Sequence, residues 1–164
     1  MKKLLIIAAV IVAGVTTNAA SFKWTAANIY GSGGTAKFDG TADLYAYLTT
    51  ADASTAVKVD TASVVAGVVK DGSTTGRVFS DDSLTSGTAY NFYFIIEDGG
   101  KQFTSAVKPA TGMDVGSASI SFGNQQSATQ NASNWSGSSP VPEPTSGLLI
   151  LLGMAGLALK RKHA

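Results

Sequence analysis

The chain has 164 residues, with 12 basic and 11 acidic side chains and a formal net charge of +1 at pH 7. It contains no cysteine and one histidine, His163, so the body of the chain cannot build a disulfide, a cysteine or serine–histidine nucleophile, or an ordinary zinc site. Without its two terminal basic clusters the body carries seven basic and ten acidic side chains, which argues against a nucleic-acid partner. We therefore expect a protein that is not an enzyme and that has no cofactor and no metal site.

Residues 1–20 are predicted to be a secretory signal peptide. Lys2 and Lys3 form a charged start, residues 4–15 are apolar, and small residues follow as a cleavage zone. The apolar run is too short for a stable transmembrane helix. Cleavage after Ala19 is favoured over cleavage after Ala20, and either implies export by the secretion machinery with a signal peptidase.

Residues 21–122 have the composition of an all-β domain. Gly, Ser, Thr, Ala and Val dominate, and apolar residues alternate over short runs separated by turn signals. Strands are expected over residues 22–30, 42–49, 77–80, 88–97, 101–107 and 115–122. Residues 50–70 are ambiguous, because their valines favour strands whereas Ser54 or Thr55 could cap a short helix. The prediction is a small antiparallel β-sandwich.

The clearest strand covers residues 88–97. One of its faces carries four large apolar side chains, Tyr90, Phe92, Phe94 and Ile96. The glycines after Asp98 predict a turn, and residues 101–107 return as the second strand of a hairpin.

The stretch that leads into this strand is Leu84-Thr85-Ser86-Gly87-Thr88-Ala89-Tyr90. Its Leu–x–x–Gly–Thr–x–Tyr spacing resembles the tyrosine corner of fibronectin type III domains, where a tyrosine hydroxyl binds upstream backbone. The resemblance implies an immunoglobulin- or fibronectin III-like sandwich with Trp24 buried inside it. The proline that usually precedes Gly87 is missing, and a β-meander with an ordinary glycine turn is the alternative.

Residues 123–140 are predicted to be a flexible polar linker. They are rich in Asn, Gln, Ser, Thr and Ala, and they offer little apolar surface for packing. Such a linker would hold the β-domain away from a membrane.

Residues 141–164 begin with a proline-rich motif, continue with an apolar run expected to be a helix over residues 147–159, and end in basic residues. The motif and the basic cluster consist of Val141, Pro142, Glu143, Pro144, Lys160, Arg161 and Lys162. As a helix the run is about 20 Å long, which is less than the ~30 Å hydrocarbon core of a bilayer. A short span of this kind suits a segment that is cut away, and the basic cluster would stay in the cytoplasm.

This order of parts resembles the PEP-CTERM sorting signal. The resemblance implies recognition and cleavage by exosortase, a membrane enzyme, in bacteria that make exopolysaccharide. It also implies that the C-terminal helix lies in the membrane before processing, and that the protein ends at the cell envelope, on the surface or in the extracellular matrix. A permanent tail anchor and a helical hairpin of a soluble domain are the alternatives.

Two hypotheses remain for the body. The first is a non-enzymatic surface or extracellular-matrix protein. The second is a carbohydrate-binding module associated with exopolysaccharide, in which exposed aromatic rings stack on sugars. Tyr45 and Tyr47 are the main stacking candidates, with Tyr30, Tyr93 and Trp135 as further ones. An exposed row of rings favours sugar binding, whereas complete burial counts against it.

Two pairs of adjacent acidic residues, Asp81-Asp82 and Glu97-Asp98, are candidates for the two carboxylates of a glycosidase site. A glycosidase needs two carboxyl groups about 5 to 10 Å apart across a cleft. Neighbouring residues on a strand point to opposite faces, so we expect these acids in solvated turns.

Overall fold

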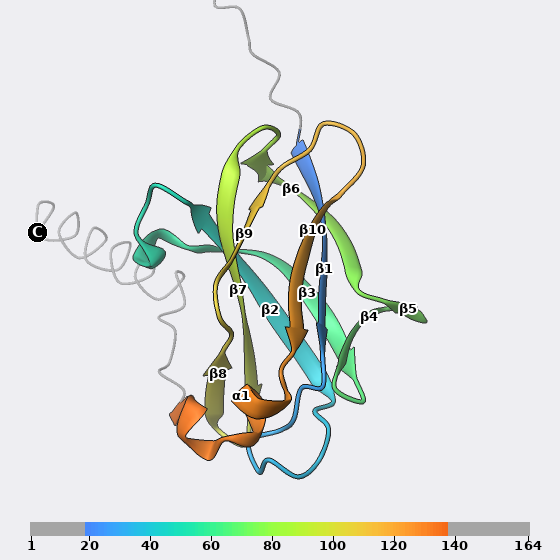
Figure 1. The fold of residues 1–164 in the computed structure, drawn as a ribbon, viewed down its shortest axis with the longest axis vertical. Coiled ribbons are helices and arrows are strands. Elements are labelled where there is room, and N and C mark those ends of the chain that lie inside the picture. Colours follow the sequence, from blue (N-terminus) through green and yellow to red (C-terminus); the bar gives the residue numbers. More distant parts are fainter. Residues whose placement is uncertain (1–18, 138–164) are drawn as a thin grey trace, which may run out of the picture.

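The structure is a computed structural model that describes residues 19–137. Its regular elements are strands apart from three short helical turns, so the fold class is all-β (Figure 1). Within the described part, no helix is long and apolar enough to cross a bilayer. The predicted signal peptide up to residue 18 and the predicted apolar helix over residues 147–159 lie outside the described residues.

The smaller of two sheets has three strands. Their order is β10 (Ala118–Asn124), β1 (Ala19–Ala27) and β6 (Arg77–Thr85). β1 pairs antiparallel with β6 but parallel with β10. The parallel pair departs from the predicted antiparallel arrangement, because it joins strands from the two ends of the domain that no local turn connects.

The larger sheet is antiparallel throughout. Its order is β11 (Trp135–Gly137), β8 (Lys101–Thr104), β7 (Ala89–Asp98), β2 (Gly40–Leu48), β3 (Val57–Val65), β4 (Val68–Asp71) and β5 (Thr74–Thr75). A further strand, β9 (Lys108–Thr111), also pairs with β7.

The two sheets pack face to face around one aromatic core. Phe22 and Trp24 of β1 are fully buried against β7, with ring centroids 4.9 Å from Phe92 and 6.0 Å from Phe94, respectively. The apolar face predicted for β7, from Tyr90 to Ile96, is buried at every position, which confirms that prediction. Each such side chain contributes about 1.5–3 kcal/mol when it is removed from water.

Two local predictions around β7 are confirmed. The Tyr90 hydroxyl accepts a hydrogen bond from the backbone N–H of Thr85 at 2.9 Å, which is the contact expected of a tyrosine corner. β7 and β8 form the expected hairpin, in which Asp98 pairs with Lys101. The two glycines between them have φ of 56° and 74°, as a type I′ turn requires.

The ambiguous stretch over residues 50–70 forms a helical turn and two strands. The turn η1 (Ala53–Thr55) is capped by Asp52, whose carboxylate accepts the N–H of Ser54 at 2.8 Å. β3 and β4 follow, joined by Ala66 and Gly67 at φ of 49° and 72°. Gly67 is required there, because a Cβ would lie 2.4 Å from the carbonyl oxygen of Ile29.

The structure corrects the predicted flexible linker over residues 123–140. As far as Gly137, these residues complete β10 and form α1 (Gln126–Gln130), η2 (Ala132–Asn134) and β11, which pairs with β8. Thr129 and Trp135 are buried, and the indole Nε1 of Trp135 donates to the carbonyl oxygen of Thr129 at 3.0 Å. A single tryptophan therefore anchors a segment whose average composition is polar.

A polar cluster, the inter-sheet clamp, consists of Trp24, Asp60 and Arg77. The Asp60 carboxylate of β3 is 6% exposed. It accepts hydrogen bonds from Nε1 of Trp24 at 2.9 Å and from Nε of Arg77 at 3.0 Å. Because Trp24 and Arg77 belong to the smaller sheet, the clamp ties the two sheets together with charge-assisted hydrogen bonds.

Candidate functional site

The predicted site residues fall into two groups. The sorting-signal residues, Val141 to Pro144 and Lys160 to Lys162, lie outside the described residues. The predicted stacking residues Tyr45 and Tyr47 lie on β2, and the structure brings them together with Tyr93 of β7. We call these three residues the tyrosine cluster.

The tyrosine cluster lies on the outer face of the larger sheet. Along β2, Leu44 and Ala46 point into the core, so the alternation of a strand turns both tyrosines outward. Tyr45 lies directly opposite Tyr93, and their rings stack with centroids 5.4 Å apart and planes inclined by 7°. The ring of Tyr47 lies 6.4 Å from that of Tyr93 at 58°. All three rings are half-buried.

Charged side chains surround the cluster. Asp43, two residues before Tyr45 on the same face, accepts a hydrogen bond from Oγ1 of Thr61 at 2.6 Å and pairs with Nζ of Lys58 at 3.5 Å. Burial, and then the negative charge of Asp43, raise the pKa of the Tyr45 phenol above its ordinary value. Burial, and then Tyr45, raise the pKa of Tyr93. The phenols of Tyr45 and Tyr93 therefore stay neutral at physiological pH and can both donate and accept hydrogen bonds.

The arrangement of the tyrosine cluster is neither the exposed row of rings that favours sugar binding nor the complete burial that counts against it. Tyr45 and Tyr93 cover one face of each other, so the three rings do not form a flat exposed row. They are not fully buried either, and each keeps part of its surface in solvent. The cluster can therefore offer hydroxyl groups and the remaining ring faces to a hydroxyl-rich ligand.

The two other stacking candidates, Tyr30 and Trp135, are covered by neighbouring side chains. The ammonium group of Lys37 lies 4.1 Å from the centroid of the Tyr30 ring and covers it. Trp135 is buried against Phe103, with ring centroids 5.8 Å apart. Neither ring is arranged to receive a sugar.

One carboxylate of each acidic pair accepts hydrogen bonds from a serine. The Asp81 carboxylate accepts hydrogen bonds from the N–H and the hydroxyl of Ser83, and that of Asp98 accepts the N–H of Ser32 at 2.6 Å. The prediction of solvated turns is wrong for both pairs, because Asp81 and Asp82 lie within β6 and Glu97 and Asp98 form the end of β7. Over residues 19–137 no three Asp, Glu, His or Cys side chains come together as metal ligands.

Sequence reasoning missed an apolar hollow of about 380 Å³ beside the tyrosine cluster. Its walls come from β2, the η1 region, the start of β3 and the β6–β7 corner, and they include Tyr47, Leu48, Val57, Leu84 and Tyr90. Leu48 and Val57 are about half exposed. In the sequence, the signal for this hollow was an apolar residue at the end of one strand, Leu48, and another at the start of the next, Val57. Their proximity follows only from the fold.

Comparison with known proteins gives one match. Residues 140–162 match the family model of the PEP-CTERM protein-sorting motif, which confirms the resemblance of the C-terminal segment. The motif implies an exported protein associated with the cell envelope and an interaction with an exosortase-type processing enzyme. No curated protein and no solved structure matches the chain.

Proposed function

We propose that this chain, with its PEP-CTERM protein-sorting motif at residues 140–162, is a non-enzymatic envelope or extracellular-matrix protein. A signal peptidase removes the N-terminal segment, and an exosortase-type enzyme cuts near Pro142, Glu143 and Pro144. The β-domain then leaves the membrane or is displayed on the cell surface. The sorting motif is the observation that carries this proposal.

The N-terminal end of the domain supports one detail of the proposal. Ala20 is fully buried in β1, where it pairs with Asp81 of β6, whereas Ala19 is exposed. Cleavage after Ala19 keeps Ala20 in the core, but cleavage after Ala20 removes it. The burial of Ala20 supports cleavage after Ala19, so we propose that the mature protein begins at Ala20.

The test is the intact mass of the protein recovered separately from membrane, medium and exopolysaccharide of its native cells. The proposal expects a species outside the membrane that begins at Ala20 and lacks the residues after the Pro-Glu-Pro motif. The triple variant Pro142→Ala, Glu143→Ala, Pro144→Ala should stay in the membrane with its tail. Ser138→Ala with Ser139→Ala is the matched control and should be processed normally. A wild-type chain that keeps Ala164 in the membrane contradicts the proposal.

A second candidate function is carbohydrate binding, and the tyrosine cluster favours it. Three half-buried tyrosine rings lie together near Asp43 and Lys58 on one sheet face. Electrophoresis through gels that contain exopolysaccharide from the native cells should retard the wild type, and Tyr45→Ala and Tyr47→Ala should each reduce the retardation. Tyr30→Ala, at a ring already covered by Lys37, should leave it unchanged. Equal mobility of all four proteins contradicts sugar binding.

A further inference from the structure

The folded domain ends very close to the sorting motif. β11 ends at Gly137 and the matched motif begins at residue 140, so two residues lie between them. An extended chain covers at most ~3.6 Å per residue. Pro142 therefore lies within about 18 Å of Gly137 whatever path the backbone takes. An enzyme that acts at Pro142 to Pro144 works within reach of the surface of the domain.

This end of the domain is firmly attached to the core. Oγ1 of Thr129 accepts the N–H of Tyr30 at 3.0 Å and donates to the carbonyl oxygen of Gln125 at 2.8 Å. The side chain of Gln125 donates to the carbonyl oxygen of Phe122 at 2.6 Å. With Trp135 buried as well, the segment does not lengthen the tether unless these bonds break.

The surface of this end has a distinct chemistry. Residues 123–137, which we call the neutral cap, contain no charged residue and no histidine. On the cap a hollow of about 350 Å³ is lined by the amide and hydroxyl groups of Asn124, Gln126, Ser127 and Gln130. In Figure 1, α1 lies at the opposite end of the domain from the start of β1.

A protein surface fits the cap better than a lipid surface does. Anionic headgroups attract clusters of Lys and Arg, and membrane-inserting surfaces carry large apolar side chains. The exposed side chains that line the hollow have neither property and instead offer neutral donors and acceptors.

We propose that the neutral cap is the surface through which the folded domain contacts the exosortase-type enzyme while the motif is being cut. This inference rests on the proposed function. The short tether brings the cap to the enzyme, and its neutral amides bind polar groups around the entrance to the active site. The cap is thus a second recognition element beside the Pro-Glu-Pro motif.

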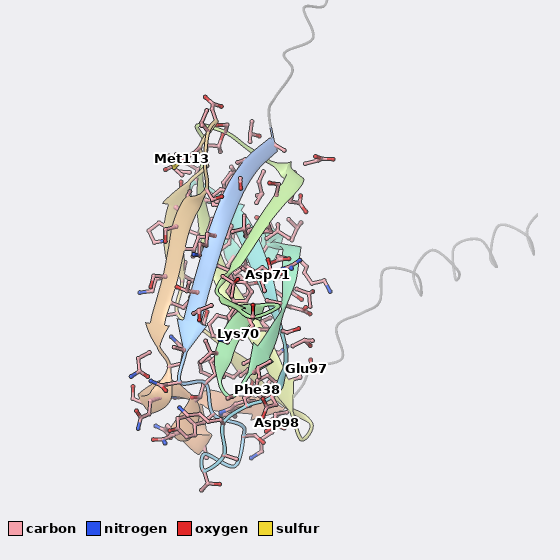
Figure 2. All side chains as sticks on the ribbon, turned by 90° about the vertical axis from the view of Figure 1, so that its right-hand side faces the viewer. Phe38, Lys70, Asp71, Glu97, Asp98 and Met113 are labelled. Carbon is pink, nitrogen blue, oxygen red and sulfur yellow. The ribbon has the colours of Figure 1, made fainter. Side chains whose placement is uncertain are left out.

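The experiment places two negative charges on the cap with Gln126→Glu and Gln130→Glu in the full chain. The matched control is Met113→Glu with Val115→Glu, which adds the same charge at exposed positions, 49% and 84% exposed, in a loop far from the cap. Figure 2 shows Met113 at the opposite end of the domain from Phe38 and Asp98. Tryptophan fluorescence checks that each variant is folded, since Trp24 and Trp135 are buried.

The readout is the rate of tail removal in native cells, measured by intact mass after a pulse of expression. We expect the cap variant to be processed at least about fivefold more slowly and the control at the wild-type rate. A flexible 12-residue Gly/Ser spacer between Gly137 and Ser138 should restore the cap variant, because the motif then reaches the enzyme without the cap. Gln130→benzoylphenylalanine should give a light-induced cross-link to the enzyme.

Equal processing rates of the wild type and the cap variant overturn the cap contact and leave the proposed function standing. A cross-link from position 130 to lipid alone also overturns it, in favour of a membrane contact. A wild-type chain that retains its tail overturns the proposed function and the cap contact together.

Discussion

The inter-sheet clamp and the tyrosine cluster both combine aromatic rings with charged groups, but they lie on opposite faces of the larger sheet. In the clamp, a nearly inaccessible carboxylate receives hydrogen bonds from Trp24 and Arg77. In the cluster, the rings are half-buried and the side chain of the neighbouring Lys58 is 53% exposed. Burial therefore makes the first group a structural joint, whereas exposure leaves the second free to meet a ligand.

The largest expected effect comes from the clamp. Asp60→Ala removes the acceptor of Nε1 of Trp24 and of Nε of Arg77, whose Nη1 keeps only the exposed Asp71 at 3.3 Å, and should cost about 2–3 kcal/mol of unfolding free energy. This value is below the cost of a fully buried pair, because Arg77 is 34% exposed. The matched control Asp43→Ala removes the exposed partner of Lys58 and should cost less than about 1 kcal/mol. Urea unfolding followed by tryptophan fluorescence measures both, and equal losses would contradict the comparison.

An intermediate effect is expected within the tyrosine cluster. The stacked pair Tyr45 and Tyr93 should show a coupling of about 0.5–1.5 kcal/mol in a double-mutant cycle with Tyr45→Ala and Tyr93→Ala. The same cycle between Tyr45 and Tyr30, whose ring packs against Lys37 instead, should give a coupling near zero. A coupling free energy near zero for the stacked pair would mean that Tyr45 and Tyr93 contribute to stability independently and that their stacking adds nothing.

The smallest effect is expected at alkaline pH. The pKa values of Tyr45 and Tyr93 are raised in the folded state, mainly by burial. The unfolded chain thus loses these protons first, so stability is intact below the ordinary tyrosine pKa of about 10 and falls as the pH rises above it. Urea unfolding across this range should show the fall, and Tyr45→Phe with Tyr93→Phe should make it shallower. An unchanged slope would falsify this assignment.

The sequence predicted best where a strong pattern coincides with a local turn. β7 has large apolar side chains at every second position, and the glycines before Lys101 allow only a tight return. The hydroxyl of Tyr90 was likewise predictable, because its partner at Thr85 is five residues away. Each of these features is determined within about a dozen residues.

Features that depend on distant partners were not predictable. The parallel pairing of β1 with β10 places Phe22 opposite Ala118, and the sequence of neither strand indicates which strand it pairs with. The cap was misjudged because its order rests on Trp135 and Thr129 meeting Phe103 and Tyr30 from other parts of the chain. The tyrosine cluster was partly predictable. Alternation along β2 places Tyr45 and Tyr47 on one face, but only the register between β2 and β7 places Tyr93 opposite Tyr45.

The parallel alignment of β1 and β10 also has a mechanical consequence. The start of β1 and the end of β10 lie at opposite ends of the domain (Figure 1). A force that pulls these two ends apart runs along both strands, so the hydrogen bonds from Phe22↔Ala118 to Thr25↔Ser121 are loaded in shear and share the load. A force applied perpendicular to the strands would instead break these hydrogen bonds one after another. In the proposed extracellular matrix, this alignment would resist extension of the domain along its long axis.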